Sequence, residues 1–226
     1  MDSNRIKRSE ADVAVLAVGI SQTPQGNTHT GVVYVDGKGQ MRFLEQAFHK
    51  VTRSELVQES VSFCDGLFLF ALLDIDPDRA EIVAGLCRLI ASTRPSFTYA
   101  LMYDPDAQFD VHTGRLSLPS GKGLNCSTFV LVLFKSAQFP LIDFSGWPER
   151  EEDVRAHKEL IRLLRDNQPP SEQGHIAAVE NEVGCIRARP EEVAGSCLCR
   201  LPARFENAQS AGQAILEKLG EIQRAG

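Results

Sequence analysis

Residues 29–48 read HTGVVYVDGKGQMRFLEQAF and give the clearest structural signal in the chain. Apolar and β-branched residues fill 30–35 and again 41–48, and Asp36-Gly37-Lys38-Gly39 lies between them. An Asp-Gly turn flanked by two apolar strands is typical of an antiparallel hairpin. We therefore predict a hairpin whose first strand begins near His29 and whose second strand carries Glu45.

On either side of this hairpin the sequence predicts a mixture of strands and helices. Short apolar runs indicate buried strands at 13–20 and 65–73. Thr52 followed by Glu55 has the form of a capping box and predicts a helix over 52–59. Asp76 before Pro77 begins a helix that continues to about residue 92. Amphipathic or charged patterns predict further helices at 149–165, 190–198 and 208–224.

Composition limits the class of protein. The 226 residues are 43% hydrophobic and 24% charged, as in an ordinary globular protein, and the net charge is -6. A negative balance argues against nucleic acid as a partner, because nucleic-acid binders usually carry a basic excess. We expect no membrane span, since every apolar run is shorter than the roughly 18 residues needed. The polar start of the chain lacks a signal-peptide pattern, so we expect the cytoplasm, or export as an effector by a route without a signal.

The six cysteines do not predict a disulfide framework or a metal site. They are sparse, contain no CxxC pair, and come without a signal sequence, so most should be reduced and buried. The single CxC lacks a suitable fourth ligand for zinc. We expect no metal or organic cofactor. The cysteines are Cys64, Cys87, Cys126, Cys185, Cys197 and Cys199.

Cys126 is the one of the six that stands out as a candidate nucleophile. It opens the segment NCSTFV at 125–130, directly after the polar loop SGKG at 120–123. The apolar run that follows is compatible with a buried strand or a buried helix. At a helix start, free backbone N–H groups and the helix dipole would lower the thiol pKa and could hold an oxyanion. The alternative is that Cys126 is a small residue at the edge of the core.

His29 and Glu45 are the candidate partners of Cys126. His29 lies at the loop side of the first hairpin strand, where Gly31 allows close approach of another group. Glu45 on the return strand could accept a hydrogen bond from the His29 ring, whereas a one-residue change in register would put Gln46 there instead. The alternatives are a solvent-exposed loop histidine and a solvated strand carboxylate.

Together these segments resemble the NlpC-type papain-like cysteine hydrolases. NCSTFV resembles the family's nucleophile segment, in which Asp or Asn precedes Cys-Ser at the head of a buried helix. HTGVVYVDGKGQMRFLEQA resembles its histidine strand, turn and third polar position. His29 precedes Cys126, which is the circularly permuted order of the YiiX-like hydrolases and the lecithin:retinol acyltransferase group. FLEQA is similar to the strand that carries the third residue, here Glu45. Tyr99 resembles the tyrosine upstream of the cysteine, with Tyr103 as its rival.

The resemblance covers about residues 11–137 and implies both a fold and a mechanism. It implies an α+β papain-like domain over 1–144, with an antiparallel sheet packed on the Cys126 helix. Residues 145–226 match nothing in the family's motifs, and their helical patterns predict a helical extension packed on or beside that domain. Cys126 would attack a carbonyl, His29 would act as base and acid, and Glu45 would orient His29. Tyr99, Asn125 and Ser127 would line the substrate and oxyanion region.

The implied activity is cleavage of an amide bond in a peptide, a peptidoglycan or an isopeptide. Acyl transfer, or hydrolysis of a lipid or other ester, is the alternative from the same residues. A catalytically silent binding protein is a third reading, and in each case the C-terminal helices could bind a protein partner. The substrate would be peptide-like or another acyl compound.

The other four histidines are not expected to take part. His49 should be a surface residue at the hairpin end, and His112 a loop residue. His157 should lie on the solvated face of a charged helix. His175 has no partner that the sequence identifies.

Overall fold

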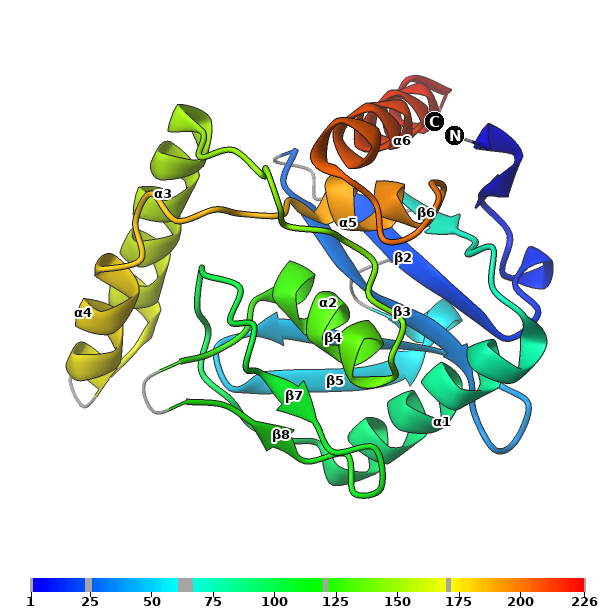
Figure 1. Cartoon of the computed structure of the whole chain (residues 1–226), viewed down its shortest axis with the longest axis horizontal. Helices are drawn as coiled ribbons and strands as arrows, with labels where there is room; N and C mark the ends of the chain where they lie inside the picture. The colour runs from blue at the N-terminus through cyan, green and yellow to red at the C-terminus, as the bar shows by residue number, and fades with distance from the viewer. Residues whose placement is uncertain (1, 23–25, 61–66, 120–121, 170–171, 226) are drawn as a thin grey trace.

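The computed structural model describes residues 2–22, 26–60, 67–119, 122–169 and 172–225. It is an α+β structure in which a six-stranded antiparallel sheet has the strand order β1-β6-β2-β3-β4-β5 (Figure 1). The strands are β1 Ile6–Lys7, β2 Leu16–Gln22, β3 Thr28–Val35, β4 Met41–Phe48, β5 Val51–Leu56 and β6 Phe68–Ala71, with a separate pair formed by β7 Gln108–Phe109 and β8 Leu116–Ser117. The α-helices are α1 Pro77–Thr93, α2 Cys126–Ser136, α3 Glu151–Asn167, α4 Gln173–Glu180, α5 Pro190–Ser196 and α6 Phe205–Ala225.

The β3–β4 hairpin forms as predicted. Val32 pairs with Leu44 and Val35 with Met41. In the turn, the Asp36 carboxylate accepts hydrogen bonds from the backbone N–H groups of Lys38 and Gln40, at 2.8 and 3.0 Å. These bonds give the turn a local cause that is independent of the rest of the fold.

The helix predicted over 52–59 is wrong. This segment forms β5, which pairs with β4, followed by the 3-10 turn Val57–Glu59. The Thr52 hydroxyl does not cap a helix; it donates to the Pro95 carbonyl at 2.7 Å and to the Gln46 side-chain oxygen at 3.0 Å. Strand β4, at the edge of the hairpin, offers backbone hydrogen-bond partners along the length of this segment, and this pairing outweighs the local capping pattern.

The other elements lie close to their predicted positions. Asp76 caps α1 by accepting from the Arg79 N–H at 3.0 Å, and Pro77 is the first residue of that helix. The segment 126–137, which was compatible with a strand or a helix, forms α2. The strand predicted over 13–20 begins three residues later, and the described part of 65–73 contains β6.

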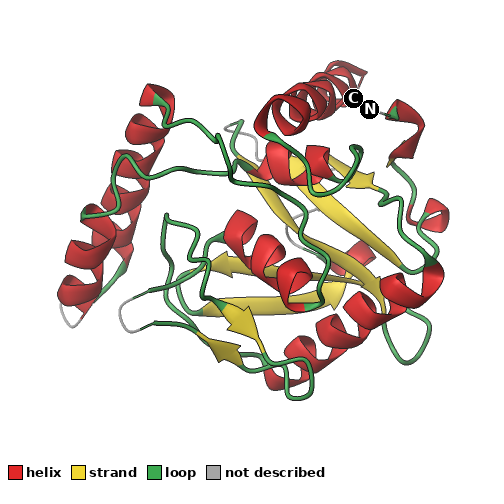
Figure 2. Ribbon diagram, in the orientation of Figure 1, coloured by secondary structure: helices red, strands yellow, loops and turns green. Residues whose placement is uncertain are grey.

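Helices cover one face of the sheet and bury most of the core (Figure 2). Helix α2 packs against β3 and β4, and α5 and α6 share the same apolar cluster with α1. The alternate residues of β2 and β3, such as Ala17 and Val33, form a smaller cluster on the other face. The start of α2 is therefore fixed against the middle strands of the sheet.

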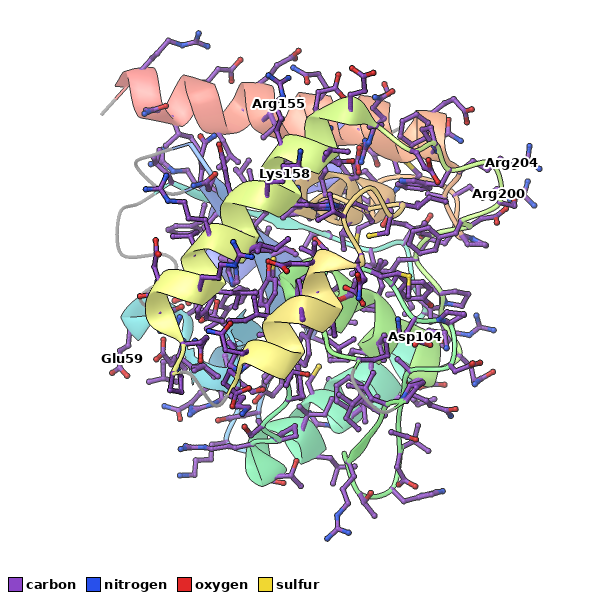
Figure 3. All side chains as sticks on the ribbon, turned by 90° about the vertical axis from the view of Figure 1, so that its left-hand side faces the viewer. Glu59, Asp104, Arg155, Lys158, Arg200 and Arg204 are labelled. Carbon is purple, nitrogen blue, oxygen red and sulfur yellow. The ribbon has the colours of Figure 1, made fainter. Side chains whose placement is uncertain are left out.

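Helices α3 and α4 form an arm beside this core, at the left in Figure 1. They pack on each other and on Leu101 through a separate apolar cluster that includes Ile161 and Ile176. Figure 3 views the arm from its outer side, where Arg155 and Lys158 project from α3. Within the described ranges, no helix combines the length and the apolar content needed to cross a membrane.

Candidate active site

Cys126 is the first residue of α2, and the helix start is built around Asn125. The Asn125 side-chain oxygen accepts from the Thr128 N–H at 3.0 Å, and the Thr128 hydroxyl accepts from the Asn125 N–H at 2.8 Å. This capping box leaves the N–H groups of Cys126 and Ser127 without a hydrogen-bond partner in the described part of the chain. Two backbone donors at the start of α2 are therefore available to an oxyanion.

His29 and Glu45 are in direct contact. His29 Nε2 lies 2.5 Å from Glu45 Oε2, and the Glu45 side chain is 1% exposed. Glu45 Oε1 lies 3.1 Å from Arg53 Nε on the neighbouring strand β5. The buried carboxylate thus orients the ring through Nε2 and leaves Nδ1 for a second partner.

Gln46 does not take the third position. Its side-chain nitrogen donates to the Phe48 carbonyl at 2.6 Å and to the Phe97 carbonyl at 3.4 Å. The hairpin register therefore places Glu45, as the sequence predicted, beside His29.

A glycine shapes the wall behind the histidine. A Cβ at Gly31 would lie 2.6 Å from the Leu44 carbonyl oxygen and from the Phe43 ring. Because Gly31 has none, the Phe43 ring closes over the strand, and its centroid lies 6.4 Å from that of His29 in an edge-on contact. Close approach at Gly31 thus helps to hold the imidazole in place.

The electrostatics couple His29 to Cys126. Burial lowers the pKa of His29, but the charge of Cys126, a hydrogen bond to it, and the contact with Glu45 raise that pKa to about 10. Burial raises the pKa of the Cys126 thiol, yet the His29 charge and hydrogen bond, with smaller effects from the Thr30 N–H and Arg187, bring it below its ordinary value. The arrangement favours a thiolate–imidazolium pair.

The other described cysteines have the opposite character. Burial raises the pKa of Cys185 to about 11 and that of Cys197 to about 12, and it also raises the pKa values of Cys87 and Cys199. All are free thiols, and Cys64 lies outside the described residues. Of the five cysteines that the structure describes, Cys126 is the one whose pKa is lowered.

Tyr99 lies near the thiol and Tyr103 does not. Burial and the Cys126 charge raise the pKa of the Tyr99 phenol, so its hydroxyl stays protonated. Tyr103 stacks on Phe144 instead, with ring centroids 4.6 Å apart. Tyr99 is therefore the tyrosine whose phenol is coupled to the thiol charge, and its protonated hydroxyl can act as a hydrogen-bond donor.

Asn125 has a structural task that the sequence did not reveal. Its side-chain nitrogen donates to the carbonyls of Ala100 and Leu101, at 2.9 and 3.3 Å. With its oxygen committed to Thr128, the amide group is fully engaged. It fixes the helix start against the 99–104 segment rather than presenting itself to a substrate.

Glu182 reinforces this segment and was not foreseen. Its Oε2 accepts from the N–H groups of Leu101 and Met102, at 2.9 and 3.2 Å, and its Oε1 lies 3.5 Å from Lys122 Nζ. Glu182 thereby connects the end of the arm to the backbone that holds Asn125. A long-range contact of this kind, 81 residues along the chain from Leu101, leaves no local sequence signal.

Two histidines predicted at the surface are buried. His157 is 1% exposed and accepts from the Gly184 N–H at 3.3 Å. It lies between Val154 and Ile161 at helical spacing, in the apolar stripe of α3. The prediction placed His157 on the solvated face because histidine is polar, and this was wrong. His49 is 5% exposed because α4 covers it: its ring centroid lies 4.9 Å from that of His175. His112 is exposed in its loop, as predicted.

The described residues form no metal site near these groups. Among the residues it describes, no three His, Cys, Asp or Glu side chains converge in a way that could hold an ion. What the site offers is a thiolate, an imidazolium, a buried carboxylate and free backbone donors, which together suit nucleophilic attack on a carbonyl.

Comparison with known proteins gives no match: neither a family model, nor a curated protein, nor a solved structure is similar to this chain.

Proposed function

We propose that the protein is a thiol hydrolase that cleaves an amide bond through Cys126, His29 and Glu45. One arrangement carries the proposal: the buried Cys126 is the first residue of α2, the charge of His29 lowers the pKa of its thiol, and the buried Glu45 carboxylate lies 2.5 Å from the His29 ring and orients it. A cysteine that only fills the core or the surface does not need such an arrangement. Burying charged groups is unfavourable for folding, so their presence here indicates a function.

In the first half of the reaction, the Cys126 sulfur attacks the carbonyl carbon and the carbonyl electron pair moves to oxygen. The N–H groups of Cys126 and Ser127 hold this oxyanion. When the carbon–nitrogen bond breaks, the His29 imidazolium gives its proton to the leaving amine, and a thioester remains on Cys126.

In the second half, neutral His29 takes a proton from water and the resulting oxygen attacks the thioester. The carbon–sulfur bond breaks, a carboxylic acid leaves, and the thiolate–imidazolium pair is restored. Glu45 holds the ring and stabilises its charge throughout, without carrying a proton itself.

The proposed fold family is the papain-like group in permuted order. Its support is the arrangement of parts: the nucleophile heads a helix packed on an antiparallel sheet, and the histidine and acid come from adjacent strands earlier in the chain. Arrangements of catalytic groups recur on unrelated folds, so the chemistry of the site is the stronger part of the proposal.

The test is the rate at which iodoacetamide alkylates each cysteine at pH 6.5, followed by peptide mass spectrometry. Cys126 should react at least tenfold faster than Cys199, the control thiol, because alkylation follows the thiolate fraction. His29→Ala should remove most of this advantage. Equal rates at Cys126 and Cys199 in the unmodified protein would contradict the proposal.

A further inference from the structure

An extended segment leads from the arm to α5 and carries an arginine toward the proposed site. Ile186 and Ala188 on this segment pack into the main apolar core, so Arg187 between them lies on the opposite side. The Arg187 carbonyl accepts from Trp147 Nε1 at 3.0 Å and from Arg150 Nη2 at 2.8 Å. These two bonds fix the backbone from which the side chain projects.

The segment lies beside the strand that carries the histidine. Glu191, four residues after Arg187, accepts a hydrogen bond from the Thr28 hydroxyl at 2.7 Å, and Thr28 is next to His29. The positive charge of Arg187 lowers the pKa of Cys126 and opposes the upward shift of Tyr99, so it acts on two groups of the site from the arm side.

Arg187 is held loosely by its ion-pair partner. Its Nη1 lies 3.7 Å from Asp153 Oδ1, beyond hydrogen-bond distance. The same carboxylate is already bonded to Arg150 Nε at 2.7 Å and to Arg189 Nε at 2.9 Å. Asp153 therefore makes its hydrogen bonds with the two other arginines, and its contact with Arg187 is a longer ion pair.

The cluster sets three guanidinium groups against two buried carboxylates and one exposed carboxylate. Three guanidinium groups, of Arg150, Arg187 and Arg189, share two buried carboxylates, and the second of these, Glu192, is bonded to Arg150. A third acid, Glu152, is 64% exposed and lies 3.8 Å from Arg189. Among the described residues, Arg187 thus keeps most of its donors for another anion, and its side chain is 28% exposed.

We infer that Arg187 binds a carboxylate of the acyl substrate, close to the carbonyl that Cys126 attacks. This rests on the proposed function, and it narrows the substrates to acyl compounds with a negative charge beside the scissile bond. A guanidinium pairs with a carboxylate through two parallel N–H bonds, which gives both affinity and orientation. The matching chemistry is an acidic side chain or a free carboxyl group, rather than a lipid tail.

The test compares two alkylating reagents of equal size at Cys126, anionic iodoacetate and neutral iodoacetamide. The ratio of the iodoacetate rate to the iodoacetamide rate does not depend on the thiolate fraction, which affects both reagents equally. It therefore measures the effect of positive charge near Cys126 on an anionic reagent. Arg187→Gln should lower the ratio about five- to tenfold, and Arg187→Lys should keep at least a third of it. The matched control is Arg189→Gln, since Arg189 is 29% exposed and bonds the same Asp153. It should change the ratio less than twofold.

An unchanged ratio in Arg187→Gln, or an equal fall in Arg189→Gln, would overturn the inference. Neither result would touch the proposed function, which depends on the faster reaction of Cys126 with iodoacetamide. A second measurement needs no variant: succinate should protect Cys126 of the unmodified protein from iodoacetamide, whereas neutral succinamide should not. Equal behaviour of the two compounds would also count against a carboxylate site.

Discussion

Replacing Glu45 with Gln changes one charge at the centre of the site while keeping the shape of the side chain. The Glu45 carboxylate lies 2.5 Å from the His29 ring and is buried, so solvent screens the pair weakly. An amide oxygen can still accept the bond from Nε2, but it no longer offsets the imidazolium charge. We therefore expect the ring to stay in place and to lose its proton more easily.

The size of the change follows from the kind of hydrogen bond. A bond to a charged group contributes about 1.5–3 kcal/mol, which corresponds to roughly one to two pKa units. The His29 pKa is raised to about 10 in the native protein, so the variant should titrate near pH 8–9. Because the folded-state pKa is raised, the associated stability is present below pH 6.5 and is lost as pH rises toward 10. The variant should lose part of this stability at neutral pH.

Histidine side-chain 15N NMR measures the titration directly, with His29 assigned from a His29→Asn variant. Arg53→Gln is the control, since it removes the other partner of Glu45 without touching the ring. A His29 titration midpoint in Glu45→Gln that lies within 0.3 pH units of the unmodified protein, a limit set well below the roughly one-unit shift expected, would refute the reasoning.

Three further outcomes follow from the structure. Cys126→Ala and His29→Ala should each abolish hydrolysis of any substrate that the protein cleaves, and the double variant should be no worse than either single variant, because the two residues act as a unit. His112→Ala should retain most of the activity, and an equal loss there would mean that His112 is the base. Glu182→Ala leaves the N–H groups of Leu101 and Met102 without this acceptor, so urea denaturation should show that the free energy of unfolding falls by about 1–3 kcal/mol, and by less in Glu182→Gln. Full stability of the Ala variant would exclude the role given to this carboxylate. Burial lowers the pKa of His157 to about 4, so between pH 6.5 and 4 the unfolded chain binds a proton that the folded protein does not, and the free energy of unfolding falls as pH falls through that window. By pH 5 the loss of stability is about 2 kcal/mol. This loss should be missing from the pH profile of His157→Gln.

Local patterns predicted well where Cys126, His29 and Glu45 lie, because these residues belong to elements with strong local causes. The hairpin has its own turn chemistry in Asp36, and its register alone decides between Glu45 and Gln46. The capping pair of Asn125 and Thr128 lies within four residues of sequence, so the helix start at Cys126 was also within reach of a sequence argument.

Contacts between distant segments could not be predicted. Thr52 and Glu55 form a capping pattern, but pairing with β4 overrides it, and only the tertiary fold supplies that partner. His49 is buried by a helix more than 120 residues further along the chain. Arg187 and Glu182 lie near the site because the tertiary fold brings the end of the arm there. No spacing in the sequence indicates this arrangement.

The first and last described segments lie side by side. Lys218 Nζ on α6 is 3.4 Å from the Ser3 carbonyl, and Figure 1 shows the first described residues next to this helix. A short linker could join them, and the exposed turn between β7 and β8 offers a place for new ends. The rearranged chain would be synthesised with Cys126 ahead of His29 and Glu45 and would still bring the same three side chains together. The order in which the ribosome makes these residues is therefore a property of the gene, and the proposed chemistry depends only on where the side chains meet.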